Sequence, residues 1–376
     1  MGNCCFTADR SNLPASSLDL PIRELSIWGL CPGSPGELLI CSEDTSVAVY
    51  NVSTERLTHQ WRGHNKGVNR LAYLPNTSVA VSGSRDTSIR LWKRSATEAV
   101  AVLSAHTLPV TGLATIDHHN QICSGSRDCA FRLWDAATSA NVACAEVSQN
   151  LVTFMSAVPT EPAVLQTGED LSLRLWDTRV MQAVQMLPQH SNIPLCCDVS
   201  LDGLYFATSC NGFDGEGCEV CFWDRRQLKL IWQCSGHQQA TKACIFLPTA
   251  NKHLVNGTSC SQQEDVPVGD VGLSMNSGCL VDNASWMKTG SPVLLASASA
   301  DGTVKVWELG RDLPVCTVAP PREVQGAMMT CLAVCSSKQH EQGCTAAAES
   351  LFAGTFSGHL HSWDMHKLGA SRPAME

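Results

Sequence analysis

The sequence lacks the features that would place the chain across a membrane, in a secretory pathway or on nucleic acid. It contains no run of about 18 apolar residues, so no segment is long enough to span a bilayer as a helix. The start of the chain has no basic segment followed by an apolar block, which argues against a secretory signal. It has no basic stripe, and its formal net charge is −9, so we expect no nucleic-acid partner.

Cysteine is abundant, with 20 residues in the chain. Without a secretory signal we expect these thiols to be reduced, in the cytoplasm, and mostly buried in strands. The pair Cys218 and Cys221 has a spacing used in zinc sites, but no second CxxC or HxxxH pair follows it. On one strand this spacing would also point the two thiols to opposite faces. We therefore expect no metal site and no cofactor.

A segment that ends in tryptophan recurs at a fixed interval. Ser82-Gly-Ser-Arg-Asp-Thr-Ser-Ile-Arg-Leu-Trp92 is echoed by Ser124-Gly-Ser-Arg-Asp-Cys-Ala-Phe-Arg-Leu-Trp134. Trp92, Trp134 and Trp176 follow one another at intervals of 42 residues. A constant period of this size indicates one structural unit copied along the chain.

This period and the Trp-Asp endings resemble the WD40 repeat, in which each unit forms one four-stranded blade of a propeller. The resemblance implies an all-β fold, a seven-bladed WD40 β-propeller. Its seven aromatic markers are Tyr50, Trp92, Trp134, Trp176, Trp223, Trp307 and Trp363. The interval from Trp223 to Trp307 is twice 42 residues, which leaves room for an eighth blade. Residues 259–291 are polar and rich in Gly and Ser, so we favour a loop insertion in blade six.

We expect three segments. Residues 1–20 form a tail and linker, residues 21–366 form the propeller, and residues 367–376 form a C-terminal tail. Propellers often close by taking a strand from the N-terminus into the last blade, and Leu18-Asp-Leu20 is the candidate for that strand.

Three sets of His, Ser, Asp and Trp superficially resemble a nucleophilic Ser-His-Asp site. An enzyme needs one such site, whereas these sets recur at blade intervals. In WD40 proteins such residues form a buried hydrogen-bond chain, so we expect structural tetrads and no catalytic residues. The sets are His64, Ser82, Asp86 and Trp92; His106, Ser124, Asp128 and Trp134; and His237, Ser297, Asp301 and Trp307.

Two further motifs suggest partner surfaces. Arg85 and Arg127 each precede a tetrad aspartate, while Glu43 and Glu169 hold the corresponding places in blades one and four. Propellers carry these positions on one rim, where the charges either bind a partner or are merely solvated. Arg179 and Arg226 complete two WDxR sequences, which are similar to the box that docks some WD40 proteins onto the adaptor of cullin-RING ubiquitin ligases. Ordinary strand ends with a surface arginine are the alternative.

The glycine-rich segment Asn211–Glu219 fits neither a calcium loop nor a phosphate loop. It is either a mobile hairpin or a partner contact. Together with the segment 166–177 it resembles a narrower WD40 family linked to cilia, membrane trafficking and small-GTPase regulation. That resemblance implies a non-enzymatic scaffold for ciliary trafficking or GTPase-regulating complexes. A substrate receptor of a cullin-RING ligase is the alternative.

The first residues, Met1-Gly-Asn-Cys-Cys5, carry two lipidation signals. Gly2 would become the acceptor for a myristoyl group, and Cys4 and Cys5 are candidates for palmitoylation. One acyl chain binds a membrane marginally, whereas two make a stable anchor. Phe6 departs from the usual Ser or Thr, and an unmodified tail is the alternative.

We predict that the wild-type chain sediments with membranes and that Gly2→Ala releases it into the soluble fraction, because the first acyl chain is lost. Cell fractionation measures this. Identical fractionation of the two proteins would show that no anchor is attached at Gly2.

Overall fold

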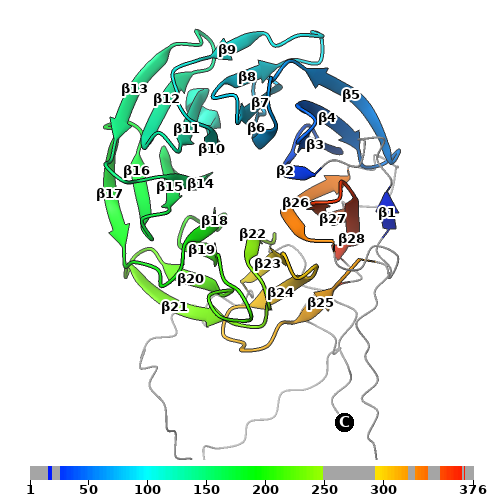
Figure 1. Cartoon of the computed structure of the whole chain (residues 1–376), viewed down its shortest axis with the longest axis vertical. Coiled ribbons are helices and arrows are strands. Elements are labelled where there is room, and N and C mark those ends of the chain that lie inside the picture. The colour runs from blue at the N-terminus through cyan, green and yellow to red at the C-terminus, as the bar shows by residue number, and fades with distance from the viewer. Residues whose placement is uncertain are drawn as a thin grey trace, which may run out of the picture.

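The computed structural model is a closed ring of seven four-stranded antiparallel sheets (Figure 1). It describes residues 16–18, 26–248, 293–320, 327–337, 348–365 and 368. The predicted seven-bladed all-β propeller is thereby confirmed. Within the described residues no helix has the length and apolar character needed to cross a bilayer.

Each blade is a four-stranded meander. Blade one contains β2 (Ile27–Pro32), β3 (Glu37–Ser42), β4 (Ser46–Asn51) and β5 (Arg56–Arg62). Blade two contains β6 (Val68–Leu74), β7 (Val79–Ser84), β8 (Ile89–Trp92) and β9 (Ala101–Leu103). Blade three contains β10 (Val110–Ile116), the short helix η1 (Asp117–His119), β11 (Gln121–Ser126), β12 (Ala130–Asp135) and β13 (Asn141–Glu146). Blade four contains β14 (Val152–Ala157), β15 (Ala163–Gly168), β16 (Leu173–Asp177) and β17 (Gln182–Leu187).

The remaining blades repeat this order. Blade five contains β18 (Pro194–Val199), β19 (Tyr205–Cys210), β20 (Val220–Asp224) and β21 (Lys229–Cys234). Blade six contains β22 (Thr241–Phe246), β23 (Leu294–Ser299), β24 (Val304–Glu308) and β25 (Cys316–Val318). Blade seven contains β26 (Met329–Ser337), β27 (Ala348–Thr355) and β28 (Leu360–Asp364). The first strand of every blade lies at the centre of the ring (Figure 1).

The ring closes through a strand from the start of the chain. The strand β1 (Ser16–Leu18) pairs antiparallel with β28, so that blade seven also has four strands. This strand lies slightly before the predicted 18–20. Because β1 covers the outer edge of β28, the ends of the chain are joined by backbone hydrogen bonds.

The turn between the second and third strands has the same left-handed residue in most blades. Thr45, Thr87, Cys129 and Leu171 have positive φ at this position, and Gly302 takes it in blade six. In blade two the Asp86 carboxylate accepts the backbone N–H of Ser88, which stabilises the turn around the left-handed residue. The repeated Asp therefore shapes a tight turn as well as contributing to the tetrad.

Large side chains fill the spaces between neighbouring sheets. Trp92 and Trp307 are fully buried. The rings of Trp61 and Trp92 stack with centroids 6.0 Å apart, and those of Phe131 and Trp176 stack at 4.9 Å. Replacing one such tryptophan by alanine typically costs about 3–5 kcal/mol of stability, so this packing is a major contribution to the fold.

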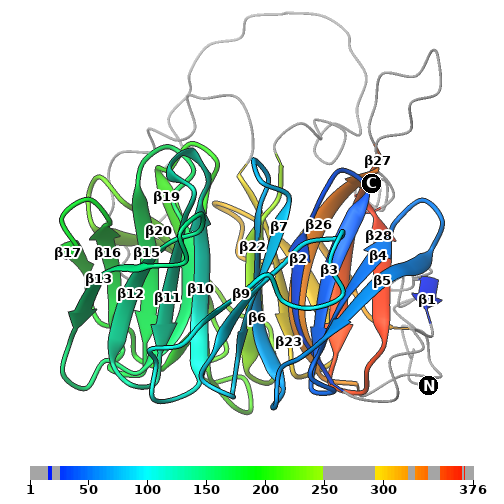
Figure 2. The same cartoon turned by 90° about the horizontal axis from the view of Figure 1, so that it is seen from above.

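The meander gives the ring two distinct faces, which Figure 2 shows edge-on; the face named upper below is at the bottom of that view, and the face named lower, with the turn between β4 and β5, is at the top. We call the upper face the one that carries the turns between second and third strands and the connections between blades. We call the lower face the one that carries the turns between first and second and between third and fourth strands. Arg85 and Arg127 belong to upper-face turns, whereas Arg179 and Arg226 belong to lower-face turns.

We predict that a chain starting at residue 20 is less stable and more prone to self-association than one starting at residue 15. The shorter chain loses β1 and leaves β28 as an exposed edge. Both chains lack the N-terminal lipidation signals, so the comparison isolates the strand. Thermal melts and size-exclusion chromatography measure the effect, and equal melting temperatures would show that β1 does not stabilise the ring.

Candidate functional site

A buried histidine links each incoming connection to the sheet in blades two, three and six. In blade two His64 Nδ1 lies 2.9 Å from the Asp86 carboxylate, and His64 Nε2 lies 2.7 Å from Ser82 Oγ. Trp92 Nε1 donates to the same hydroxyl at 2.8 Å. The corresponding residues are His106, Asp128, Ser124 and Trp134 in blade three and His237, Asp301, Ser297 and Trp307 in blade six.

The donor and acceptor of each hydrogen bond in this tetrad can be assigned by starting from the tryptophan. The Trp134 indole can only donate, so Ser124 Oγ accepts from it and donates its own proton to His106 Nε2. His106 Nδ1–H then donates to Asp128. Burial lowers the pKa of His106, which keeps the imidazole neutral at pH 7. Burial alone would raise the pKa of Asp128, but the Thr107 N–H and His106 outweigh it and lower that pKa.

The tetrad serines are not accessible to a substrate. Ser82, Ser124 and Ser297 are all completely buried. A nucleophile has to reach its substrate, and these hydroxyls instead satisfy two buried partners each. Their geometry is that of a structural link.

Blade four replaces the tetrad with a different buried network. Gln166 stands at the serine position, and neither its side-chain amide nor Trp176 Nε1 has a hydrogen-bond partner within the described part of the chain. Arg174 pairs with Asp170 and donates to Asn150 Oδ1 at 3.1 Å. Arg174, from the third strand, thus links the incoming connection at Asn150 to the turn at Asp170, as the histidine does in blades two, three and six.

The upper face joins neighbouring blades by ion pairs. Arg85 of blade two pairs with Glu43 of blade one, and Arg127 of blade three pairs with Glu169 of blade four, each at 2.9 Å. The Arg85 guanidinium also lies over the Trp28 ring, 5.0 Å from its centroid. All four charged groups are partly exposed, so each pair contributes little stability but remains available to a partner.

A hollow of about 750 Å³ opens beside these residues. Its walls include Trp28, Phe213, Met328 and Phe356, and the ring of Trp28 meets that of Phe356 edge-on at 5.9 Å. Phe213 belongs to the glycine-rich segment 211–219, where its N–H binds Glu216 O and closes a tight turn. Phe213 is 76% exposed, so this turn holds an aromatic ring out in solvent.

The sequence pattern does not single out Trp28, Phe356 or Arg70, and it marks Phe213 only as part of the segment 211–219. Arg70 donates to Thr111 O and Thr153 O and lies over Phe154 at 4.6 Å, which ties the inner strands of three blades together. Trp28 had a signal, because a tryptophan at the start of a first strand is not part of the repeat. Phe356 and Arg70 have no such signal in the sequence, and only the fold brings them to their partners.

The lower face presents the two WDxR arginines in neighbouring blades. Arg179 binds Asp177 and Arg226 binds Asp224, so each guanidinium folds back on the aspartate of its own motif. Their side chains remain 68% and 48% exposed. The two motifs lie at equivalent turns of blades four and five and face the same way.

Some predicted features lie outside the described residues. These are the lipidation residues Gly2, Cys4 and Cys5, the insertion 259–291, and most of the tail 367–376. They stay predictions. Every cysteine that the structure describes is free of disulfide bonds.

Comparison with known families agrees with the repeat pattern. The family model of the WD domain, G-beta repeat, matches residues 55–93, 97–135 and 279–308. The chain therefore contains WD40 repeats. The first two matches each begin at the outer strand of one blade and end at the third strand of the next. Each repeat thus bridges two blades, which couples neighbouring sheets along the chain.

We predict that Asp128→Ala destabilises the protein by about 1–3 kcal/mol, because it leaves the buried His106 Nδ1 without an acceptor and also removes the acceptor of the Thr107 N–H. Chemical denaturation measures this. Glu146→Ala removes the same charge from an exposed position of the same blade and serves as the control. Equal unfolding free energies for both variants would contradict a stabilising role for the tetrad.

Proposed function

We propose that this chain is a non-enzymatic scaffold that binds a protein partner on its upper face. The observation that carries the proposal is the hollow bounded by Trp28, Phe213, Met328 and Phe356, with the Arg85 and Arg127 pairs beside it. Exposed aromatic and arginine side chains around a concave surface are typical of binding hot spots. WD40 propellers in general bind other proteins.

Trp28 connects the two parts of this surface. It contacts Phe356 in the hollow, stacks under Arg85 and donates Nε1–H to Glu43 at 2.6 Å. A second hollow of about 350 Å³ lies between Trp28, Arg85 and Arg127. An apolar side chain of the partner would fill the larger hollow, and a carboxylate of the same partner would reach the arginines.

We further propose that acylation at Gly2 with Cys4 or Cys5 tethers this scaffold to a membrane. The resemblance to WD repeat-containing protein 31 in segments 166–177 and 211–219 supports a role in ciliary trafficking or cilium assembly. The second of these segments supplies Phe213 to the upper face. The resemblance and the partner surface therefore involve the same loop.

A substrate receptor of a cullin-RING ubiquitin ligase is the second candidate. It is favoured by Arg179 and Arg226, which are exposed at equivalent lower-face turns of adjacent blades. In that case the adaptor would dock on the lower face and leave the upper face for the substrate. The two candidates therefore assign different faces to different partners.

We predict that the double variant Arg85→Ala/Arg127→Ala loses most partner capture, by about tenfold or more, since truncating an interface hot spot costs about 2 kcal/mol. Proximity labelling of the tagged protein in ciliated cells measures this. The matched control is Arg179→Ala/Arg226→Ala, which removes the same charge from the opposite face. Gly2→Ala tests the tether separately.

Each result discriminates between the candidates. Loss of ciliary trafficking proteins in the upper-face variant alone supports the scaffold. Loss of a cullin adaptor in the lower-face variant alone supports the ligase receptor. Unchanged labelling in both variants, with unchanged melting temperatures, would show that neither arginine pair contacts a partner.

A further inference from the structure

Blade five departs from the tetrad in a way that gathers two thiols around a histidine. His190 occupies the connection into the blade, as His64 does in blade two, and Thr208 accepts Trp223 Nε1–H at 2.9 Å, as Ser82 does from Trp92. The residue four places after Thr208 is Gly212, where blade two has Asp86. Among the residues that the structure describes, the imidazole of His190 therefore has no carboxylate partner, and its Nε2 is buried without a hydrogen-bond partner.

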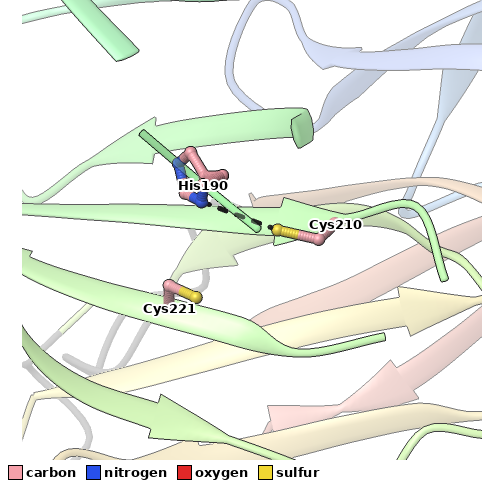
Figure 3. A group of neighbouring side chains, drawn as sticks. All are labelled: His190, Cys210 and Cys221. Carbon is pink, nitrogen blue, oxygen red and sulfur yellow. Dashed lines mark hydrogen bonds between the residues drawn. The ribbon is translucent and has the colours of Figure 1, made fainter. Parts of the chain in front are cut away.

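Two cysteines lie close to the His190 ring, and one of them approaches the nitrogen that binds the carboxylate in blade two. Cys210 ends β19, and its Sγ lies 3.7 Å from His190 Nδ1. Cys221 comes from β20, opposite Thr208, which places it diagonally across from Cys210 on the same face of the sheet. One ligand atom from each of the three residues lies within 4.8 Å of the other two (Figure 3).

We propose that His190, Cys210 and Cys221 form a binding site for a thiophilic d¹⁰ cation, in the first place Zn²⁺. Two thiolates and one imidazole are ligands that zinc prefers, and three protein ligands leave a fourth position for water or another donor. Cu(I) shares the preference for thiolates and imidazole and is distinguished by the experiment below.

The separations suit such an ion. Zn–S bonds of about 2.3 Å and Zn–N bonds of about 2.0 Å place tetrahedral ligand atoms roughly 3.5–3.8 Å apart. The His190–Cys210 separation of 3.7 Å already has this value. The remaining separations, at most 4.8 Å, would have to shorten by no more than about 1 Å, which side-chain rotation on two fixed strands can supply.

The surroundings suit a structural ion. His190, Cys210 and Cys221 are only 6%, 3% and 6% exposed, and Cys221 belongs to an apolar cluster that includes Phe206 and Trp223. A metal would join the incoming connection, β19 and β20, which is the link that Asp86 provides in blade two through His64 and the Asn65 N–H. The cation would thus replace a carboxylate as the bridge.

The acidity of Cys210 is consistent with this role. The neighbouring Cys221 thiol, followed by His190, lowers the pKa of Cys210 to about 6, although burial opposes the shift. The pKa of Cys221, the other thiol of the site, shifts the opposite way, because its contact with Cys210 and its burial raise it well above the usual range. A thiolate is the form that binds a metal.

This site differs from the one that the CxxC spacing suggested. Cys218 is not part of it, because its thiol donates to Glu216 O at 3.6 Å. The proposed site therefore does not use Cys218 and Cys221 as a ligand pair, and it shares only Cys221 with the CxxC motif. The ligands that accompany Cys221 come instead from positions 11 and 31 residues earlier in the chain.

The test uses the full chain expressed with added zinc and purified without chelator. We expect Cys210→Ser and Cys221→Ser each to lose about one equivalent of zinc relative to wild type, measured by elemental mass spectrometry. Cys218→Ser is the matched control and should keep the wild-type content, since a serine hydroxyl can also donate to Glu216 O. Competition for Cu(I) against a chromogenic chelator, run on the same four proteins, shows which ion the site prefers.

Two measurements on the wild-type chain keep the test decisive if a variant fails to fold. X-ray absorption at the zinc edge should show two sulfur ligands at about 2.3 Å and nitrogen or oxygen at about 2.0 Å. The metal-free protein should gain several degrees in melting temperature on adding Zn²⁺. Equal metal content in all four proteins, a zinc shell without sulfur, no thermal response to either ion, or a Cys210–Cys221 disulfide in peptide mapping would overturn the proposal.

Discussion

The structure depends on the hydrogen-bond chain that runs from a buried tryptophan through a serine and a histidine to an aspartate. In blade three this chain begins at Trp134 Nε1 and ends at Asp128, which also accepts the backbone N–H of Thr107. It fixes the connection into a blade against the two middle strands. Because every member satisfies a buried partner, the chain can stabilise the blade only when it is complete.

In blades four and five, which lack the complete hydrogen-bond chain, other side chains link the incoming connection to the middle strands. Blade four uses an Arg174–Asp170 pair, and blade five brings thiols to His190 in place of a carboxylate. Both solutions lie at the same place in the blade, between the incoming connection and the middle strands. Because blades two, three and six carry the complete hydrogen-bond chain, comparison with them shows which tetrad residues blades four and five have replaced.

The two faces divide the possible interactions. The upper face combines a hollow with aromatic walls and arginines held by cross-blade pairs, and Trp28 joins the two parts. The lower face offers two equally placed arginines in adjacent blades. A rigid ring can present both surfaces at once, so a partner on one face need not exclude a partner on the other.

The sequence by itself determined the repeat, the number of blades, and the histidine, serine, aspartate and tryptophan of each complete set. The repeat and the tetrad sets follow from spacings within one unit, so they are local information, whereas the number of blades also required treating the double interval between Trp223 and Trp307 as one blade with a loop insertion. The strand that closes the ring could also be predicted, although its position differed slightly. Only the tertiary structure decided that Trp28 lies beneath Arg85, that Arg85 and Arg179 occupy opposite faces, and that Cys210 and Cys221 meet at His190. These contacts depend on strand register and on packing between segments far apart in the chain, and no spacing in the sequence encodes either directly.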